Sequence, residues 1–181
     1  MLALIPFYCG SRNALLPSLA RELKASFGMP VRQYAPGFDP ELGYDASRGQ
    51  FNSRTLLSLL LHHHPEPGRL LAVTDVDLFI PVLTFVFGEA QLGGRAAVVS
   101  SHRLAPEQYG LKPDPALLEA RLIREAIHEL GHTFSLVHCG DSRCVMASSP
   151  QVEGIDLKSS RFCPACKVLL ARARSSLAEP Q

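Results

Sequence analysis

Five adjacent residues near the middle of the chain, His128-Glu129-Leu130-Gly131-His132, are of the types that zinc-assisted hydrolysis requires. Residues four apart lie on one face of a helix, so the imidazoles of His128 and His132 are expected to reach one metal ion at about 2 Å. Glu129 then lies beside that ion and can act as the general base toward a metal-activated water. The alternative is a chance string on an ordinary helix, which is rare at this chain length.

A two-histidine site needs a third protein ligand. His138, six residues beyond His132, supplies it if the helix ends just after His132 and the chain turns back. Three protein ligands leave the fourth position of a tetrahedral zinc ion open for water, as catalytic zinc sites do.

Four of the five cysteines form a C-x4-C and a C-x2-C pair, made by Cys139 with Cys144 and by Cys163 with Cys166. This spacing indicates a structural zinc site, because four thiolates fill the tetrahedral shell and leave no room for substrate. The alternative is two disulfides in a secreted protein, which the N-terminal sequence does not favour. Cys9 is interpreted as a small buried apolar residue near the first strand rather than a catalytic thiol.

Segment 128–166 resembles the archaemetzincins, whose pattern is HExxHxxGxxHCx4CxMxxS, six residues, DxK, three residues and FCxxC. One position departs from it, because Ser135 stands where the family has glycine. Segments 73–79 and 85–90 resemble the same family more loosely. The matching positions are His128, Glu129, His132, His138, Cys139, Cys144, Met146, Ser149, Asp156, Lys158, Phe162, Cys163 and Cys166.

The resemblance implies two zinc ions per chain, one catalytic and one structural. The catalytic ion would be bound by His128, His132 and His138 with Glu129 as the general base, and the four cysteines would bind the structural ion. Met146 would be the residue of the Met-turn and form an apolar floor beneath the histidines. The alternative, a methionine that only fills the core, describes nearly the same physical role.

Ser149, Asp156 and Lys158 match the pattern, but no role for them follows from the residues alone. Asp156 is interpreted as an N-cap of the helix that carries Cys163 and Cys166.

Alternating helix and strand patterns predict an α/β fold. With 46% hydrophobic and 19% charged residues, the chain is long enough for one substantial core. We expect a single domain over residues 1–181 with a metzincin-like, mixed and twisted sheet. Residues 1–138 would form a lobe with the sheet and the active-site helix, and residues 139–174 a smaller, zinc-clamped lobe with the Met-turn.

Apolar periodicity and turn residues predict the individual elements. The active-site helix is expected to begin with Asp114 as cap and Pro115 as first residue, and to bury a stripe at 118, 122, 126 and 130. His62, His63 and His64 are expected to end a helix in solvent rather than to bind metal. Other helices are expected at 13–27, at 159–174, and through Leu61 with Asn52 or Ser53 as the cap. Strands are expected at 2–5, 31–34, 70–75, 83–87 and 96–100. Irregular backbone is expected at 35–50 and 139–155, and a frayed tail after Arg174.

An outer strand of such a sheet can bind an extended peptide by backbone hydrogen bonds. The strand at residues 85–87 and the strand at residues 96–100 are the two candidates for this outer strand. For each of them, the alternative is an ordinary inner strand of the sheet.

The net charge of +1 indicates no particular partner, and the absence of a basic block argues against nucleic acid. Pro6 interrupts the apolar residues 2–5, which are too few for a signal peptide, and no run is long enough for a membrane span. We therefore expect a cytoplasmic protein, where reducing conditions suit thiolate ligands. The oligomeric state is open, with a monomer as the default.

Together these features predict a zinc-dependent metallopeptidase that hydrolyses a peptide or protein substrate through a zinc-activated water, with Glu129 as general base. The alternative is a zinc-bearing, peptide-binding module of the same fold with weak or no activity. Ser135 favours that alternative, because a serine held at positive φ at this turn is strained by about 1–2 kcal/mol. A third possibility, a small structural zinc protein, explains the cysteines but not the three histidines.

Overall fold

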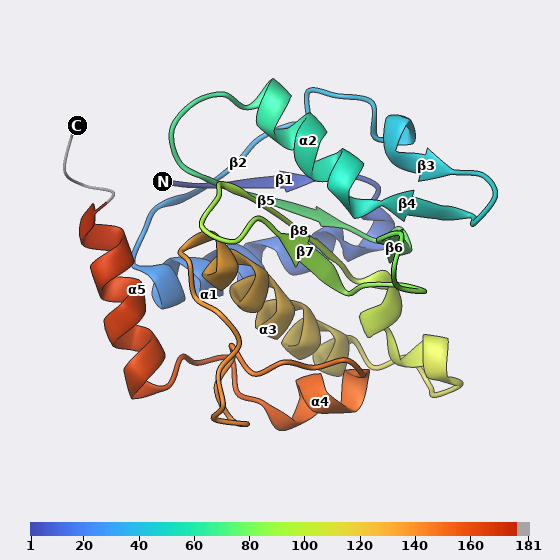
Figure 1. The fold of residues 1–181 in the computed structure, drawn as a ribbon. Coiled ribbons are helices and arrows are strands. Elements are labelled where there is room, and N and C mark those ends of the chain that lie inside the picture. Colours follow the sequence, from blue (N-terminus) through green and yellow to red (C-terminus); the bar gives the residue numbers. More distant parts are fainter. Residues whose placement is uncertain (177–181) are drawn as a thin grey trace.

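The computed structural model describes residues 1–176, and its centre is a five-stranded sheet with the order β2-β1-β5-β8-β7 (Figure 1). The first four strands run parallel, and β7 pairs antiparallel with β8. A smaller sheet has the order β3-β4-β6. The strands are β1 Leu2–Pro6, β2 Val31–Gln33, β3 Tyr44–Asp45, β4 Gln50–Asn52, β5 Arg69–Thr74, β6 Leu78–Phe79, β7 Gly88–Ala90 and β8 Ala96–Ser100.

Helices cover both faces of the large sheet. Helix α2 lies on one face, and α1 and α3 lie on the other (Figure 1). The inner strands are therefore buried on both sides, which explains why β5 and β8 are nearly continuous apolar runs. The helices are α1 Leu16–Phe27, α2 Ser53–His63, α3 Pro115–Thr133, α4 Val152–Leu157 and α5 Pro164–Ser176, with short 3₁₀ turns at Gly10–Leu15, Pro40–Gly43, His102–Leu104 and Pro106–Tyr109.

The active-site helix has the expected start and buried face. Asp114 caps α3, its carboxylate accepting from the Leu117 N–H at 2.9 Å, and Pro115 is the first helical residue. The predicted stripe is buried throughout, from Leu118 to Leu130. Helix α3 ends at Thr133, one residue beyond the motif, as a third histidine ligand requires.

Two other helices also agree with expectation in their main features. Asn52 caps α2 by accepting from the N–H groups of Arg54 and Thr55. Helix α1 begins later than expected, at Leu16, because a 3₁₀ turn precedes it, and Gly28 ends it at φ +59°. The cap at Gly28 is left-handed, a conformation that glycine adopts without steric cost.

The edge of the sheet differs from both expected candidates. Residues 83–87 form no strand; only Val86 makes an isolated bridge to Leu78. Arg48 donates to the carbonyl oxygens of Leu83 and Thr84, both at 3.0 Å, so a side chain satisfies these acceptors instead of a neighbouring strand. Strand β8 lies between β5 and β7 and is fully buried, so β7 is the edge strand on this side of the sheet, and β2 is the edge strand on the other.

The C-terminal part contains two corrections to the expected helices. Helix α5 begins at Pro164 and not at Ser159, because residues 159–161 instead hydrogen bond to residues 143–145. Asp156 does not cap α5; it lies in α4, a helix that the sequence did not predict and that begins inside the supposedly irregular stretch. The expected frayed tail falls partly on residues 177–181, outside the described residues. The division into two lobes at residue 138 stays a prediction.

No helix within residues 1–176 is long and apolar enough to cross a membrane.

The cap of α3 is expected to contribute measurably to stability. Replacing Asp114 by alanine removes the acceptor for the Leu117 N–H and should cost about 1 kcal/mol of unfolding free energy. For a chain of this size that corresponds to a fall in Tm of roughly 2–4 °C. Thermal unfolding with zinc present would measure it. Asp114→Asn, which keeps the acceptor, is the control, and an equal loss in both variants would contradict the capping role.

Candidate active site

Three histidines converge at the C-terminal end of α3. The ligand nitrogens of His128, His132 and His138 all lie within 4.8 Å of one another. The Nε2 atoms of His128 and His132 are 3.1 Å apart, and the ring centre of His138 lies 5.3 Å and 5.1 Å from the other two. The chain therefore turns back after the helix and brings His138 to the two helical histidines.

The first two imidazoles are oriented by backbone carbonyl groups. His128 Nδ1 lies 2.9 Å from the Val145 oxygen, and His132 Nδ1 lies 2.7 Å from the Leu136 oxygen. These contacts fix the rings so that both Nε2 atoms face the centre of the cluster. Burial lowers the pKa of His128 to about 3, and burial also lowers that of His132, so both rings are held neutral. A set of neutral, backbone-anchored imidazoles fits a zinc ion.

The turn between His132 and His138 contains Ser135 at φ +64°, the positive value that the departure from the family glycine predicted. At this turn the Ser135 N–H donates to the His132 oxygen at 2.9 Å, and the Leu136 N–H donates to the Gly131 oxygen at 3.3 Å. The helix thus ends on a left-handed residue, and the three-histidine cluster is formed despite the serine.

Glu129 lies between α3 and the edge strand. Its side chain is 7% exposed, and a Cβ atom added to Gly88 would lie 2.7 Å from the Glu129 Cγ and 2.6 Å from the Val98 oxygen. Only glycine therefore allows this close approach of the glutamate to β7. Burial raises the pKa of Glu129 well above its usual range, and the carboxylate of Glu125 adds to the effect. A raised pKa makes the carboxylate a stronger base than that of an exposed glutamate.

Met146 packs against α3 at the turn that carries the histidines. A Cβ atom on Gly131, which stands between His128 and His132 on α3, would be 2.5 Å from the Met146 sulfur. Met146 is fully buried, and its carbonyl oxygen accepts from the Cys139 N–H at 2.9 Å. An apolar side chain thus packs against the helix between His128 and His132, and its role as the floor of the site stays a prediction.

The four cysteines of the second motif also converge. Their sulfur atoms lie within 4.8 Å of one another, and each is a free thiol, so the structure does not contain the alternative disulfides. The Cys166 N–H hydrogen bond to the Cys163 sulfur is the main cause that lowers the pKa of Cys163 to about 7. Burial instead raises the pKa of Cys144 and of Cys166. Four sulfur atoms in one closed group fit a structural zinc ion. Cys9 is buried elsewhere, with its pKa raised to about 11 by burial.

Asp156 and Lys158, which had no derived role, both pair with α3. Asp156 binds Arg121 through two contacts, at 2.8 Å and 2.6 Å, and the Lys158 Nζ lies 2.7 Å from the Glu125 Oε1. The sequence reasoning overlooked the two partners on α3. The sequence does contain a sign of these partners. Arg121 and Glu125 are four residues apart, so they lie on the same face of the helix, and the positions beside them are apolar and buried.

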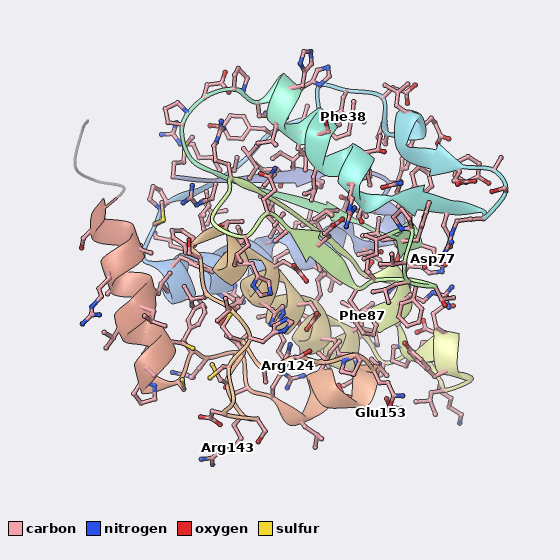
Figure 2. All side chains as sticks on the ribbon, viewed as in Figure 1. Phe38, Asp77, Phe87, Arg124, Arg143 and Glu153 are labelled. Atoms are coloured by element: carbon pink, nitrogen blue, oxygen red, sulfur yellow. The ribbon has the colours of Figure 1, made fainter. Side chains whose placement is uncertain are left out.

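An open cleft of about 450 Å³ lies beside the histidines. Phe87, the residue immediately before β7, lies between that strand and α3 (Figure 2). The Arg103 guanidinium lies 4.9 Å from the ring centre of Phe85, whose ring meets that of Phe87 edge to face. Phe85 and Phe87 therefore form an apolar wall of the cleft, and a cation–π contact from Arg103 holds the Phe85 ring. The lining residues are Leu83, Thr84, Phe85, Val86, Phe87, Gly88, Glu125, His128, Glu129, His138, Ser148, Ser149 and Pro150.

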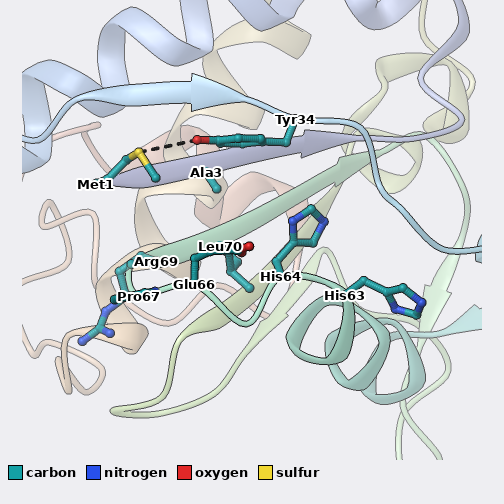
Figure 3. Close-up of a pocket in the computed structure, with 10 residues that line it drawn as sticks. Met1, Ala3, Tyr34, His63, His64, Glu66, Pro67, Arg69 and Leu70 are labelled. Carbon is teal, nitrogen blue, oxygen red and sulfur yellow. Dashed lines mark hydrogen bonds between the residues drawn. The ribbon is translucent and has the colours of Figure 1, made fainter.

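A second, smaller cavity lies beside the first residues of β1 and β5 (Figure 3). Tyr34 and His64 are among the residues that line it. The Tyr34 hydroxyl donates to the Met1 sulfur, and the His64 Nε2 lies 2.9 Å from the Pro36 oxygen. His62 and His63 are exposed at the end of α2, as expected. Among residues 1–176, these histidines belong to no group of side chains that could hold a metal ion.

The chain is similar in sequence and fold to known proteins. Residues 68–172 match the model of peptidase family M54. An archaemetzincin from Methanocaldococcus jannaschii is 42% identical over 155 residues, which cover 85% of this chain and 84% of that protein. The crystal structure of an archaemetzincin from Methanopyrus kandleri superposes with a TM-score of 0.85 at 38% identity, covering 96% of this chain and 94% of that one. The structure of a zinc-dependent peptidase from Methanocorpusculum labreanum gives a TM-score of 0.83 at 30% identity, with coverages of 94% and 100%. The chain therefore belongs to peptidase family M54.

Proposed function

We propose that the protein is a zinc metallopeptidase in which His128, His132 and His138 bind the catalytic zinc ion and Glu129 is the general base. The convergence of the three imidazoles beside an open cleft is the observation that supports this most strongly. The four cysteines would bind a second, structural zinc ion. When bound at the histidines, zinc supplies Lewis acidity, polarising a carbonyl group and lowering the pKa of water toward about 7.

The edge strand is suited to hold an extended peptide. The Ser100 N–H donates to the Phe87 oxygen, and the Gln91 N–H donates to the Ala96 oxygen. In an antiparallel pair, hydrogen-bonded positions alternate, so Gly88 and Ala90 direct their N–H and C=O groups away from β8. These groups can pair with a substrate backbone at the rim of the cleft. This assigns to β7 the peptide-binding role that the sequence left open between two other segments.

Proton transfer is assigned to Glu129, since its carboxyl group is held against β7, directly beneath this rim. It takes the proton of the attacking water and returns it to the leaving amine. The raised pKa of the buried carboxyl group favours the first transfer, because it strengthens the carboxylate as a base. The apolar wall at Phe85 and Phe87 limits the access of further water.

Ser135 is the feature that favours the alternative, a zinc-bearing peptide-binding module. Its positive φ carries a strain of about 1–2 kcal/mol. Gly93, in the turn between β7 and β8, reduces the crowding, because a Cβ atom there would lie 2.9 Å from the Ser135 Oγ. The Gly93 N–H also donates to the His132 oxygen. This accommodation, with the three nitrogens still clustered, supports an active site more than an inactive one.

The first test of the proposal is metal stoichiometry. We expect two zinc ions per chain, of which a mild chelator removes one equivalent first, because the histidine site opens to the cleft whereas the thiolate shell is closed. Elemental analysis before and after chelation would measure this. A single zinc ion, together with four cysteines that titrate freely in the folded protein, would contradict it.

The second test separates the base from the ligands. Glu129→Gln should lower kcat by at least about a hundredfold and leave both zinc ions and the fold intact. Cys163→Ser should instead destabilise the whole protein, because a structural zinc contributes on the order of 10 kcal/mol to the folding of small zinc domains. Peptide hydrolysis, zinc content and urea unfolding distinguish the two outcomes. Undiminished hydrolysis by purified Glu129→Gln protein would rule out the assigned base.

The third test concerns the strained turn. Ser135→Gly should raise kcat/KM several-fold with unchanged zinc content, because it relieves the strain at the turn between two ligands. A ligand displacement of about 1 Å can lower the rate by roughly a hundredfold, so a several-fold gain is within reach. Ser135→Ala is the matched control, since alanine removes the hydroxyl group but keeps the cost of positive φ. A glycine variant no faster than the wild type would show that Ser135 is a neutral substitution.

A further inference from the structure

Lys158 is a fully buried lysine beneath the active-site helix, and the proposed mechanism does not use it. Its side chain has no exposed surface, and that of Glu125 is 5% exposed. The Nζ atom lies 2.7 Å from the Glu125 Oε1 and donates to the Ala147 oxygen at 3.3 Å. Burying an ammonium group is costly, and an apolar pair of similar volume often stabilises a fold as well or better. Stability alone therefore gives a weak reason for this pair.

The contacts of Lys158 connect α3 with the segment 145–147. Within that segment, the Val145 oxygen orients His128, and the Ala147 oxygen accepts from Lys158. The other partner of Lys158, Glu125, lies on α3 one turn before His128 and Glu129. The ammonium group thus fixes the distance between the helix that carries the motif and the carbonyl group that sets the ring of its first histidine.

We propose that Lys158 is a positioning residue for hydrolysis: by binding Glu125 and the Ala147 carbonyl together, it holds the Val145 oxygen where it orients His128. This inference rests on the proposed peptidase function. It predicts that losing the pair harms zinc affinity and turnover even when the fold is stable.

The chain offers a matched control in the neighbouring ion pair between Arg121 and Asp156. This pair joins α4 to α3 one helical turn before Glu125, with contacts of 2.8 Å and 2.6 Å. Its third contact is from the Arg121 Nη1 to the Leu104 oxygen, and none of these contacts involves residues 145–147. Removing it tests attachment of the C-terminal segment without disturbing the carbonyl group that orients His128.

The experiment compares three proteins that contain both zinc ions. Lys158→Met alone leaves the carboxylate of Glu125 buried without its cation and is expected to unfold more easily. The double variant Lys158→Met with Glu125→Gln removes both charges and should recover most of the stability. The control is Arg121→Met with Asp156→Asn. For each protein, urea unfolding, kcat and KM for a peptide substrate, and zinc affinity at the histidine site by chelator competition are measured.

We expect the Lys158 double variant to bind zinc at the histidines about ten- to a hundredfold more weakly, as loss of groups that orient metal ligands commonly causes. Its kcat should fall on the order of tenfold or more while KM stays within about twofold. The control should lose stability with kcat and zinc affinity unchanged. Wild-type kcat and zinc affinity in the double variant, or equal losses in the control, would overturn the proposal. If the wild type hydrolyses no peptide, the peptidase function fails, and the comparison of zinc affinities still decides the role of Lys158.

Discussion

Three consecutive backbone carbonyl groups, those of residues 145–147, connect the parts of the site. The Val145 oxygen orients His128, the Met146 oxygen accepts from the Cys139 N–H, and the Ala147 oxygen accepts from Lys158. This segment has no regular secondary structure, so its conformation depends on individual hydrogen bonds such as these. A metal ion bound to the four cysteines would also restrain the third histidine, because Cys139 directly follows His138.

The opposite side of the site depends on how closely α3 approaches β7. Gly88 lets Glu129 lie against the strand, and Gly93 lets the turn after β7 lie against Ser135. The hydrogen bond from the Gly93 N–H to the His132 oxygen joins that turn to the end of the helix. The rim that would hold a peptide and the helix that carries the histidines thus form one packed unit. A shift in either would move the glutamate relative to the peptide backbone.

The parts of the site that depend on local sequence were predictable. Helical spacing placed His128 and His132 on one face, and the capping residue Asp114 located the start of α3. The edge of the sheet was not predictable, since the order of strands is set by contacts distant in sequence. Residues 83–87 have the composition of a strand, but several of their apolar side chains line the cleft. Hydrophobicity does not distinguish a cleft wall from a buried strand.

Asp156 and Lys158 show why a pattern match alone did not reveal a role. Their partners, Arg121 and Glu125, lie 35 and 33 residues earlier, so the pairing becomes visible only once α4 is packed beneath α3. The charges on α3 nevertheless limit which segment can pack against this helix. A buried helix face that presents an arginine and then a glutamate one turn later requires an acid and then a base from whatever covers it. The Asp-x-Lys spacing meets that requirement in order, so the polar residues fix the register in which the C-terminal segment docks. Apolar contacts alone, being non-directional, specify such a register less sharply.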